Sequence, residues 1–196
     1  MKRFISIITF VHIVTCVIIT HIEANIILVP EECKTIQSAI DVSKEGDTVL
    51  VAQGTYREEL SLKNGVTLQG AGEESILRLA VRALKVTDAV ISDFTMKGGT
   101  DNSHFGIFCR NSEITIKRMT IWGFHHGISA ETSKVKIEKN VVTNSFNVGI
   151  VVSSNSEAII EENRVIENQG KGMIISTSDR NITITNNTIR ENYSAG

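Results

Sequence analysis

Two histidines have the side chains best suited to metal binding or acid–base chemistry. His104 and His125 each lie two residues before a glycine, Gly106 or Gly127, and this shared spacing predicts that the two imidazoles lie one above the other. Asp101 lies nearby in the sequence. Imidazole and carboxylate groups bind zinc and copper, and a histidine beside a carboxylate can act as a general base. These three residues are candidate metal ligands, with copper, zinc or calcium as the ions considered, although loop histidines are often simply solvated and no resident cofactor is predicted.

Arg110 and Glu131 form a second candidate group, because they follow Gly106 and Gly127 at the same distance. Their equivalent positions predict neighbouring side chains in adjacent repeats. Cleavage of a glycosidic bond usually needs two carboxylates, and this face supplies only Glu131. A stacked Arg–Glu pair is also a common surface ion pair. The catalytic candidates are therefore these two residues and the two histidines, and we expect no complete active site.

Outward apolar side chains form a third group, since aromatic and aliphatic surfaces can stack against sugar rings. Strict alternation along this segment places Gly106, Phe108 and Arg110 outward. Val151 and Ile174 occupy the position of Phe108 in later repeats. This file can contact sugars or can be covered by another part of the chain.

Trp122 and Phe124 are predicted to share a corner loop, where they either form a sugar platform or close the coil. The candidate carbohydrate-binding residues are thus Phe108, Arg110, Trp122, Val151 and Ile174.

All these residues belong to a repeat of about 22 residues. Its glycine is followed by an apolar residue at Gly106, Gly127, Gly149 and Gly172, at intervals of 21, 22 and 23 residues. Two further short alternating segments lie between successive glycines, and none is long enough for a helix. Three strands per repeat predict one coil of a solenoid, in which successive coils stack into parallel sheets.

Asparagine recurs at one corner of the predicted coil. Asn140, Asn163 and Asn187 occupy equivalent positions, where stacked amides can bond along the axis as a ladder. Upstream coils have Met119 and Phe94 at this position. We assign the three asparagines a structural role.

The segment before the repeats differs from them. Residues 25–29 read as a strand, and residues 35–43 read as a short helix for which Thr35 is the N-cap. Such a helix can cover the open edge of the first coil. We divide the chain into residues 1–24, residues 25–80 with the cap and first coils, and residues 81–196 with the repeats, and we expect no cap at the carboxyl end.

The first 24 residues have the order of a secretory signal. Lys2 and Arg3 precede an apolar stretch at residues 4–19, and small residues near Ala24 suggest cleavage there. The alternative is an uncleaved membrane anchor, which is the only case in which we expect a membrane partner. We therefore predict a secreted, periplasmic or cell-surface protein, in which a Cys33–Cys109 bridge is permitted but unsupported.

The amino-acid composition favours one type of secondary structure and excludes one class of partner. The chain has 28 isoleucines and only 5% aromatic residues, which favours strands. Lys and Arg number 20 against 22 Asp and Glu, so nucleic acid is not expected as a partner.

Four segments near the amino end carry a family resemblance: residues 35–41 (TIQSAID), 46–51 (GDTVLV), 54–58 (GTYRE) and 65–70 (GVTLQG). They resemble the start of pectin-lyase-like right-handed parallel β-helix proteins, and the later repeats resemble those of NosD-like and carbohydrate-binding β-helix proteins. This resemblance implies an all-β, three-sheet, right-handed solenoid with a groove beside the Gly-Ile strand. Pro30 is the only proline, so the proline-containing catalytic patterns of pectate lyases and alginate epimerases are absent.

We predict an exported or cell-surface β-helix protein that binds a polysaccharide or glycan, or acts as a surface scaffold, with no complete active site in this chain. The alternative is a polysaccharide lyase, esterase or hydrolase of the same fold. A third hypothesis is copper or zinc handling in the periplasm. We also expect self-association through the last, uncapped coil.

Overall fold

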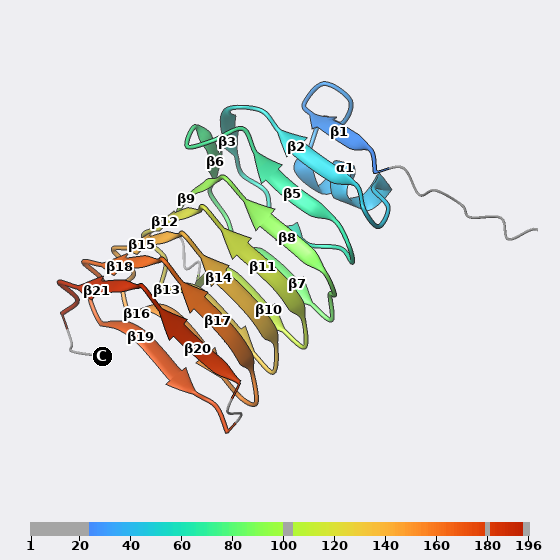
Figure 1. The fold of residues 1–196 in the computed structure, drawn as a ribbon. Helices are drawn as coiled ribbons and strands as arrows, with labels where there is room; N and C mark the ends of the chain where they lie inside the picture. Colours follow the sequence, from blue (N-terminus) through green and yellow to red (C-terminus); the bar gives the residue numbers. More distant parts are fainter. Residues whose placement is uncertain (1–23, 100–103, 179–180, 194–196) are drawn as a thin grey trace, which may run out of the picture.

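The computed structural model describes residues 24–99, 104–178 and 181–193. These residues form a solenoid of three parallel sheets with one short helix (Figure 1). The all-β solenoid predicted from the repeats is therefore confirmed.

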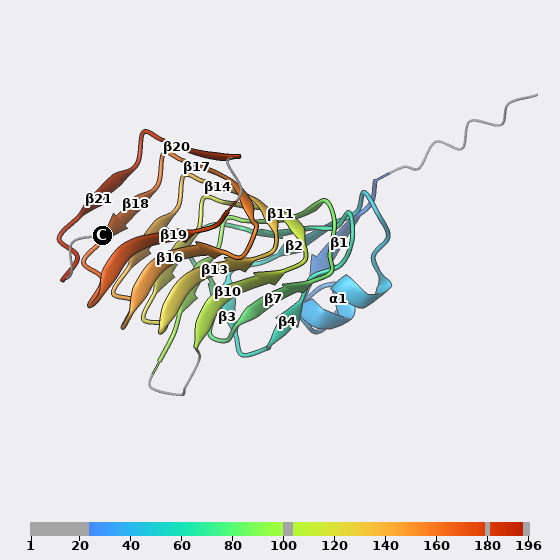
Figure 2. The same cartoon turned by 90° about the horizontal axis from the view of Figure 1, so that it is seen from below.

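Each coil visits the three sheets in the same order. Sheet A contains β1 (Ile26–Val29), β2 (Thr48–Val51), β5 (Thr67–Gly70), β8 (Ala89–Ser92), β11 (Glu113–Lys117), β14 (Lys134–Glu138), β17 (Glu157–Glu161) and β20 (Ile182–Thr185). Sheet B contains β3 (Gly54–Tyr56), β6 (Ser75–Leu77), β9 (Thr95–Lys97), β12 (Thr120–Trp122), β15 (Val141–Thr143), β18 (Arg164–Ile166) and β21 (Thr188–Arg190). Sheet C contains β4 (Leu60–Ser61), β7 (Val81–Leu84), β10 (Phe105–Arg110), β13 (His126–Glu131), β16 (Val148–Ser153) and β19 (Lys171–Ser176). Figure 2 shows sheets A and C on opposite sides of the coil.

The core consists of files of apolar side chains that stack from coil to coil. Ile107 pairs in register with Ile128, which pairs with Ile150, and all three are fully buried. Because β-branched side chains fit a pleated surface and stack on identical neighbours, these files explain the isoleucine-rich composition.

The repeated glycines face the interior, so the expectation that Gly106 points outward is wrong. A Cβ atom on Gly106 would lie 2.6 Å from the carbonyl oxygen of Gly127 and 3.0 Å from a methyl group of Ile121. Gly106 and Ile107 are both buried, so the backbone departs from strict alternation here. As a result, Phe105 joins Phe108 on the outer surface.

Polar ladders satisfy backbone groups at the corners. Asn140, Asn163 and Asn187 form the expected file, linked by side-chain oxygens that accept backbone N–H bonds from the preceding coil. Two further ladders were not predicted. One consists of Ser112, Ser133 and Ser156, and the other of Ser145, Asn168 and Asn192.

The corner between sheets A and B has a left-handed residue in each repeat. Arg118, Lys139, Glu162 and Asn186 have φ angles of 51°, 56°, 56° and 56°, and each precedes the ladder position. This conformation disfavours residues with a Cβ atom other than asparagine and aspartate. The repeat therefore stores modest strain at this corner, and left-handed residues such as Thr132 and Glu167 occur at the other two corners as well.

Helix α1 (Ile36–Val42) covers the first coil, as predicted. Thr35 is its N-cap and accepts a hydrogen bond from the backbone N–H of Ser38 at 3.2 Å. The carboxylate of Glu58 accepts the N–H groups of Ile36 and Gln37, each at 3.1 Å. Ile36, Ala39 and Ile40 are buried against the core.

The last described coil exposes side chains at positions that are buried in earlier coils. Ile184 and Ile189 are 45% and 44% exposed, whereas their register partners Ile160 and Val165 are fully buried. Self-association through this coil stays a prediction. Among the described residues, no helix is long and apolar enough to span a membrane.

Cys33 and Cys109 are both free thiols. Cys109 is fully buried and points into the core beside Ala83 and Ala130, its register partners in the neighbouring coils. The permitted Cys33–Cys109 bridge is therefore not formed.

Candidate functional site

Five rings gather on the outer face of sheet C, where β10 and β13 begin. The ring centroids of Phe105 and Phe108 lie 4.8 Å apart, and Phe105 stacks on His126 at 5.5 Å with an interplanar angle of 19°. His125 lies 4.7 Å from His126 and 5.9 Å from His104. We call these five residues the ring cluster.

The repeat explains why this cluster forms. Phe105 precedes Gly106 as His126 precedes Gly127, and the two residues pair directly in register. Because the glycine and the following isoleucine both turn inward, the residue before the glycine returns to the surface. Sequence reasoning grouped His104 with His125 and noted His126 nearby, but it missed Phe105, although the equivalent positions of Phe105 and His126 before the glycines were a usable signal.

The surroundings of His126 favour its neutral form. Partial burial lowers its pKa, and the nearby His125 and His104 lower it further. Its Nδ1 atom is buried and has no hydrogen-bond partner among the described residues. His125 differs, because its Nε2 atom lies 3.3 Å from the side-chain amide of Asn147.

Arg110 and Glu131 form an ion pair beside the ring cluster. Two guanidinium nitrogens of Arg110 contact the same carboxylate oxygen of Glu131, at 2.7 and 2.9 Å. The guanidinium carbon also lies 5.0 Å from the ring centroid of Phe108. Phe108 is therefore in contact with Arg110 and Phe105, and this packing fixes the orientation of both the charge and the ring.

The outward file through Phe108 is mixed rather than continuously apolar. Ser129 lies between Phe108 and Val151, and Ile174 follows Val151. Arg82 pairs with Phe108 on the other side. The file therefore mixes apolar side chains with Arg82 and with Ser129, which is 4% exposed.

Carboxylates are scarce on this face. Glu131 is the single carboxylate among the outward positions of β7, β10, β13, β16 and β19, which are occupied by Arg82, Leu84, Phe105, Phe108, Arg110, His126, Ser129, Glu131, Val148, Val151, Ser153, Lys171, Ile174 and Ser176. These outward positions thus do not supply the two carboxylates of a typical glycosidase.

The structure brings His104 and His125 together, whereas Asp101 lies outside the described residues. Within the described ranges, no three His, Cys, Asp or Glu side chains are arranged to hold a metal ion. Of the three predicted metal ligands, the described residues therefore bring together only the imidazoles of His104 and His125.

Trp122 lies on a different face from the other carbohydrate-binding candidates. It ends strand β12 of sheet B instead of lying in a corner loop, and it is 44% exposed. Phe124 does lie in the corner and is fully buried. The predicted carbohydrate-binding residues are therefore divided between sheets C and B.

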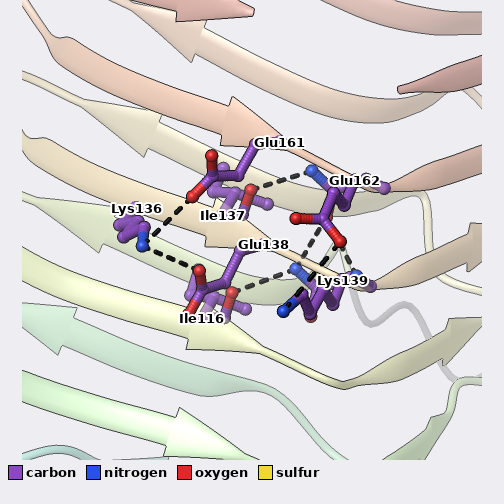
Figure 3. Close-up of polar contacts among 9 residues, drawn as sticks. Ile116, Lys136, Ile137, Glu138, Lys139, Glu161 and Glu162 are labelled. Carbon is purple, nitrogen blue, oxygen red and sulfur yellow. Dashed lines mark hydrogen bonds and ion pairs between the residues drawn. The ribbon is translucent and has the colours of Figure 1, made fainter. Parts of the chain in front are cut away.

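The outer face of sheet A carries an array of ion pairs. Lys136 lies between Glu138 and Glu161, with its Nζ atom 2.8 and 3.1 Å from their carboxylate oxygens, and Lys139 faces Glu162 at the corner (Figure 3). Lys134 pairs with Glu113, and both residues line a groove of about 380 Å³. These charges neutralise one another across coils, so this face has no strong preference for a charged ligand.

The fold and repeats define a β-solenoid, and a comparison with protein families shows which family of solenoids it belongs to. Residues 61–196 match the family model described as a right handed beta helix region. The chain therefore belongs to this family, and the predicted right-handed β-helix is confirmed. No curated protein matches the sequence.

Solved structures share this architecture at low sequence identity. The catalytic domain of a GH87 α-1,3-glucanase in complex with tetrasaccharides has a TM-score of 0.65 and 16% identity over 76% of this chain and 30% of the glucanase chain. ORF18 of Geobacillus virus E2 has a TM-score of 0.64 and 15% identity over 78% of this chain and 37% of its own. The A-module of the Azotobacter vinelandii mannuronan C-5 epimerase AlgE4 has a TM-score of 0.56 and 21% identity over 82% of this chain and 68% of its own.

The chain thus spans about a third of the length of the first two of these structures. Its fold is one that carbohydrate-active enzymes and a viral protein share. At these identities the likeness concerns the fold alone.

Proposed function

We propose that this chain is an exported carbohydrate-binding β-helix protein that contacts a polysaccharide through the outer face of sheet C. The ring cluster is the observation that carries the proposal. Ring surfaces in contact across two coils, beside hydroxyl groups and an oriented Arg–Glu pair, match the alternating apolar and hydroxyl surfaces of a sugar chain.

The ion pairing of the carboxylates on sheet C favours binding over catalysis. Glu131 is paired with Arg110, and Glu59, which lies directly before β4 of the same sheet, is paired with Arg82. The face therefore has groups to hold a sugar but lacks the usual acid and base for glycoside cleavage. The likeness of the fold to a glucanase and an epimerase supports a polysaccharide partner as a class.

The proposed location outside the cytoplasm rests on Lys2, Arg3 and the apolar residues that follow them. Expression with the native amino terminus, followed by amino-terminal sequencing of the released protein, tests it. Cleavage near Ala24 supports export, whereas retention of Met1 in a cytoplasmic fraction contradicts it.

The binding test is a glycan array, followed by calorimetry with each glycan that binds. A double variant, Phe105→Ala with Phe108→Ala, is expected to weaken binding by about tenfold or more, since it removes both phenyl surfaces. Ile159→Ala is the matched control, because Ile159 is an exposed apolar residue on sheet A. Unchanged affinity in a folded double variant would show that sheet C is not the binding face.

A polysaccharide-modifying enzyme remains the second candidate, and one observation favours it. The pKa of His126 is lowered from its ordinary value, which favours the neutral form that a general base requires. Incubation with each bound glycan, with detection of new reducing ends and unsaturated products, tests this candidate. Product formation that is lost in His126→Gln supports an enzyme, and absence of products from every bound glycan supports the binding protein.

A further inference from the structure

A second hollow lies on the outer face of sheet B, away from the ring cluster. It has a volume of about 830 Å³ and extends over β3, β6, β9 and β12. Three of its lining residues are Thr55, Thr95 and Thr120. We call this hollow the sheet B groove.

The strand register places four side chains in a row along the bottom of the sheet B groove. Thr55 pairs with Ile76, Ile76 with Thr95, and Thr95 with Thr120, so the four side chains form one outward file across four coils. Neighbouring positions in such a file lie about 4.8 Å apart. Each hydroxyl can donate and accept a hydrogen bond, and Ile76 adds an apolar surface among them. Thr95 is only 6% exposed, so Thr55 and Thr120 present most of the accessible hydroxyl surface of this file.

Trp122 lies directly beside this groove. It pairs in register with Lys97, which lines the groove, and it shares β12 with Thr120. At 44% exposed it is among the few large apolar side chains that the described surface leaves accessible. A large, rigid indole on the same strand as the last hydroxyl of the file offers a sugar chain both stacking and hydrogen bonding.

The charges around the groove indicate which glycan fits. Glu73 and Glu74 lie on its lining, opposed by the single cation Lys97. This net negative charge repels uronates and sulfated sugars, whereas carboxylates accept hydrogen bonds readily from sugar hydroxyls.

We propose that the sheet B groove, with Trp122 at its end, is a second glycan-binding site that takes an uncharged, extended polysaccharide. This proposal rests on the proposed function in one respect, namely that the ligand is a glycan. The site itself lies on sheet B, a different face of the coil. One molecule with both sites can hold two chains, or two segments of one chain, and so bind a polymer more tightly than either site alone.

Trp122 provides a direct test because it is the only tryptophan in the protein. The intact protein is titrated with linear uncharged hexasaccharides of the cello-, laminari- and malto-series, and its fluorescence is recorded. At least one series is expected to shift the emission to shorter wavelength in a saturable manner. No change with any series, measured up to millimolar concentration, overturns the proposal.

Variants then locate the site. Trp122→Ala, and Thr95→Val with Thr120→Val, are each expected to weaken binding of the active series by about tenfold. Valine keeps the branched shape of threonine and removes the hydroxyl. Thr188→Val is the matched control, because Thr188 is an exposed threonine on β21 of the same sheet. Retention of the parent affinity in both folded variants overturns the proposal.

The two proposals fail separately. If Phe105→Ala with Phe108→Ala weakens glycan binding while the fluorescence of Trp122 never responds, the sheet C site stands and the sheet B groove does not bind. If Trp122 responds to an uncharged hexasaccharide and the phenylalanine variant binds normally, the groove stands and the sheet C site fails.

Discussion

The side-chain oxygen of Asn163 accepts two hydrogen bonds from Asn140, one from its backbone N–H at 3.0 Å and one from its side-chain amide at 2.9 Å. Asn163 in turn donates to the carbonyl of Ile137 at 2.8 Å and to the side chain of Asn187 at 2.9 Å. Both Asn140 and Asn163 are fully buried. One side chain therefore satisfies two backbone groups of the preceding coil and also bonds to the side chain at the equivalent corner of the next coil.

Replacing Asn163 by alanine is expected to destabilise the protein strongly. The N–H of Asn140 and the carbonyl of Ile137 would lose buried partners, and each such loss costs about 1–3 kcal/mol. Urea unfolding monitored by circular dichroism measures the change. Asn147→Ala, at an exposed asparagine, is the control, and a loss no larger than that of the control would contradict a structural ladder.

Gly149→Ala is expected to lower the free energy of unfolding by about 1–3 kcal/mol, because the added methyl group overpacks the interior. Its Cβ atom would lie 2.6 Å from both the carbonyl oxygen of Gly172 and a methyl group of Val165. Gly99→Ala is the control, since the nearest atom to its Cβ is 3.8 Å away on the flexible Arg78 side chain. Thermal unfolding measures the stability of both variants. If Gly149→Ala is as stable as Gly99→Ala, the coils can separate to admit a side chain.

Glu162→Asn is expected to stabilise the protein by roughly 0.5–1 kcal/mol, since asparagine tolerates the left-handed conformation better than glutamate. Asn186 already occupies the equivalent corner of the next coil. The ion pair that is lost, with Lys139 at 3.9 Å, is exposed and contributes little. The midpoint of urea unfolding should rise, and a fall would show that the ion pair outweighs the backbone strain.

Cys109 is expected to resist thiol reagents in the folded protein. Burial raises the pKa of its thiol to about 12, so almost no reactive thiolate is present at neutral pH. Labelling with iodoacetamide, mapped by mass spectrometry, should modify the half-buried Cys33 first and Cys109 only in urea. Equal labelling of both cysteines in buffer would indicate that the core opens.

Asp47 should make the amino-terminal coil sensitive to acid. Hydrogen bonds from the backbone N–H groups of Asn25 and Lys44 lower the pKa of its carboxyl group below the usual range. Because the folded state binds the proton less tightly than the unfolded chain does, this contribution is present above the usual aspartate pKa. It is lost as the pH falls through the lowered value. The difference in urea midpoint between the parent and Asp47→Asn should therefore shrink from pH 7 to pH 3, and a constant difference would contradict this role.

Much of the architecture could be predicted from the sequence because a solenoid is locally encoded. The spacing of Gly106, Gly127, Gly149 and Gly172 fixed the coil length, and the recurring Asn140, Asn163 and Asn187 marked one corner. The serine ladder at Ser112, Ser133 and Ser156 carried the same kind of signal and was missed, since serine is common in loops. Thr35 and the apolar face of residues 36–40 predicted the cap helix for the usual local reasons.

The candidate site was less predictable, because its contacts depend on where each side chain points. The alternation rule put Gly106 outward, but the close approach of adjacent coils turns the glycine inward and leaves Phe105 beside Phe108. The contact of Arg110 with both Glu131 and Phe108 likewise needs a particular side-chain direction.

The sequence by itself determined the repeat, the cap and the order of the strands, because hydrophobic periodicity and corner residues act within one coil. The tertiary structure alone decided which face each candidate occupies. It placed His126 against Phe105 on sheet C and Trp122 beside the groove on sheet B. The physical reason is that residues 21 to 25 positions apart meet only after the coils stack, and backbone packing then sets which side chains share a surface.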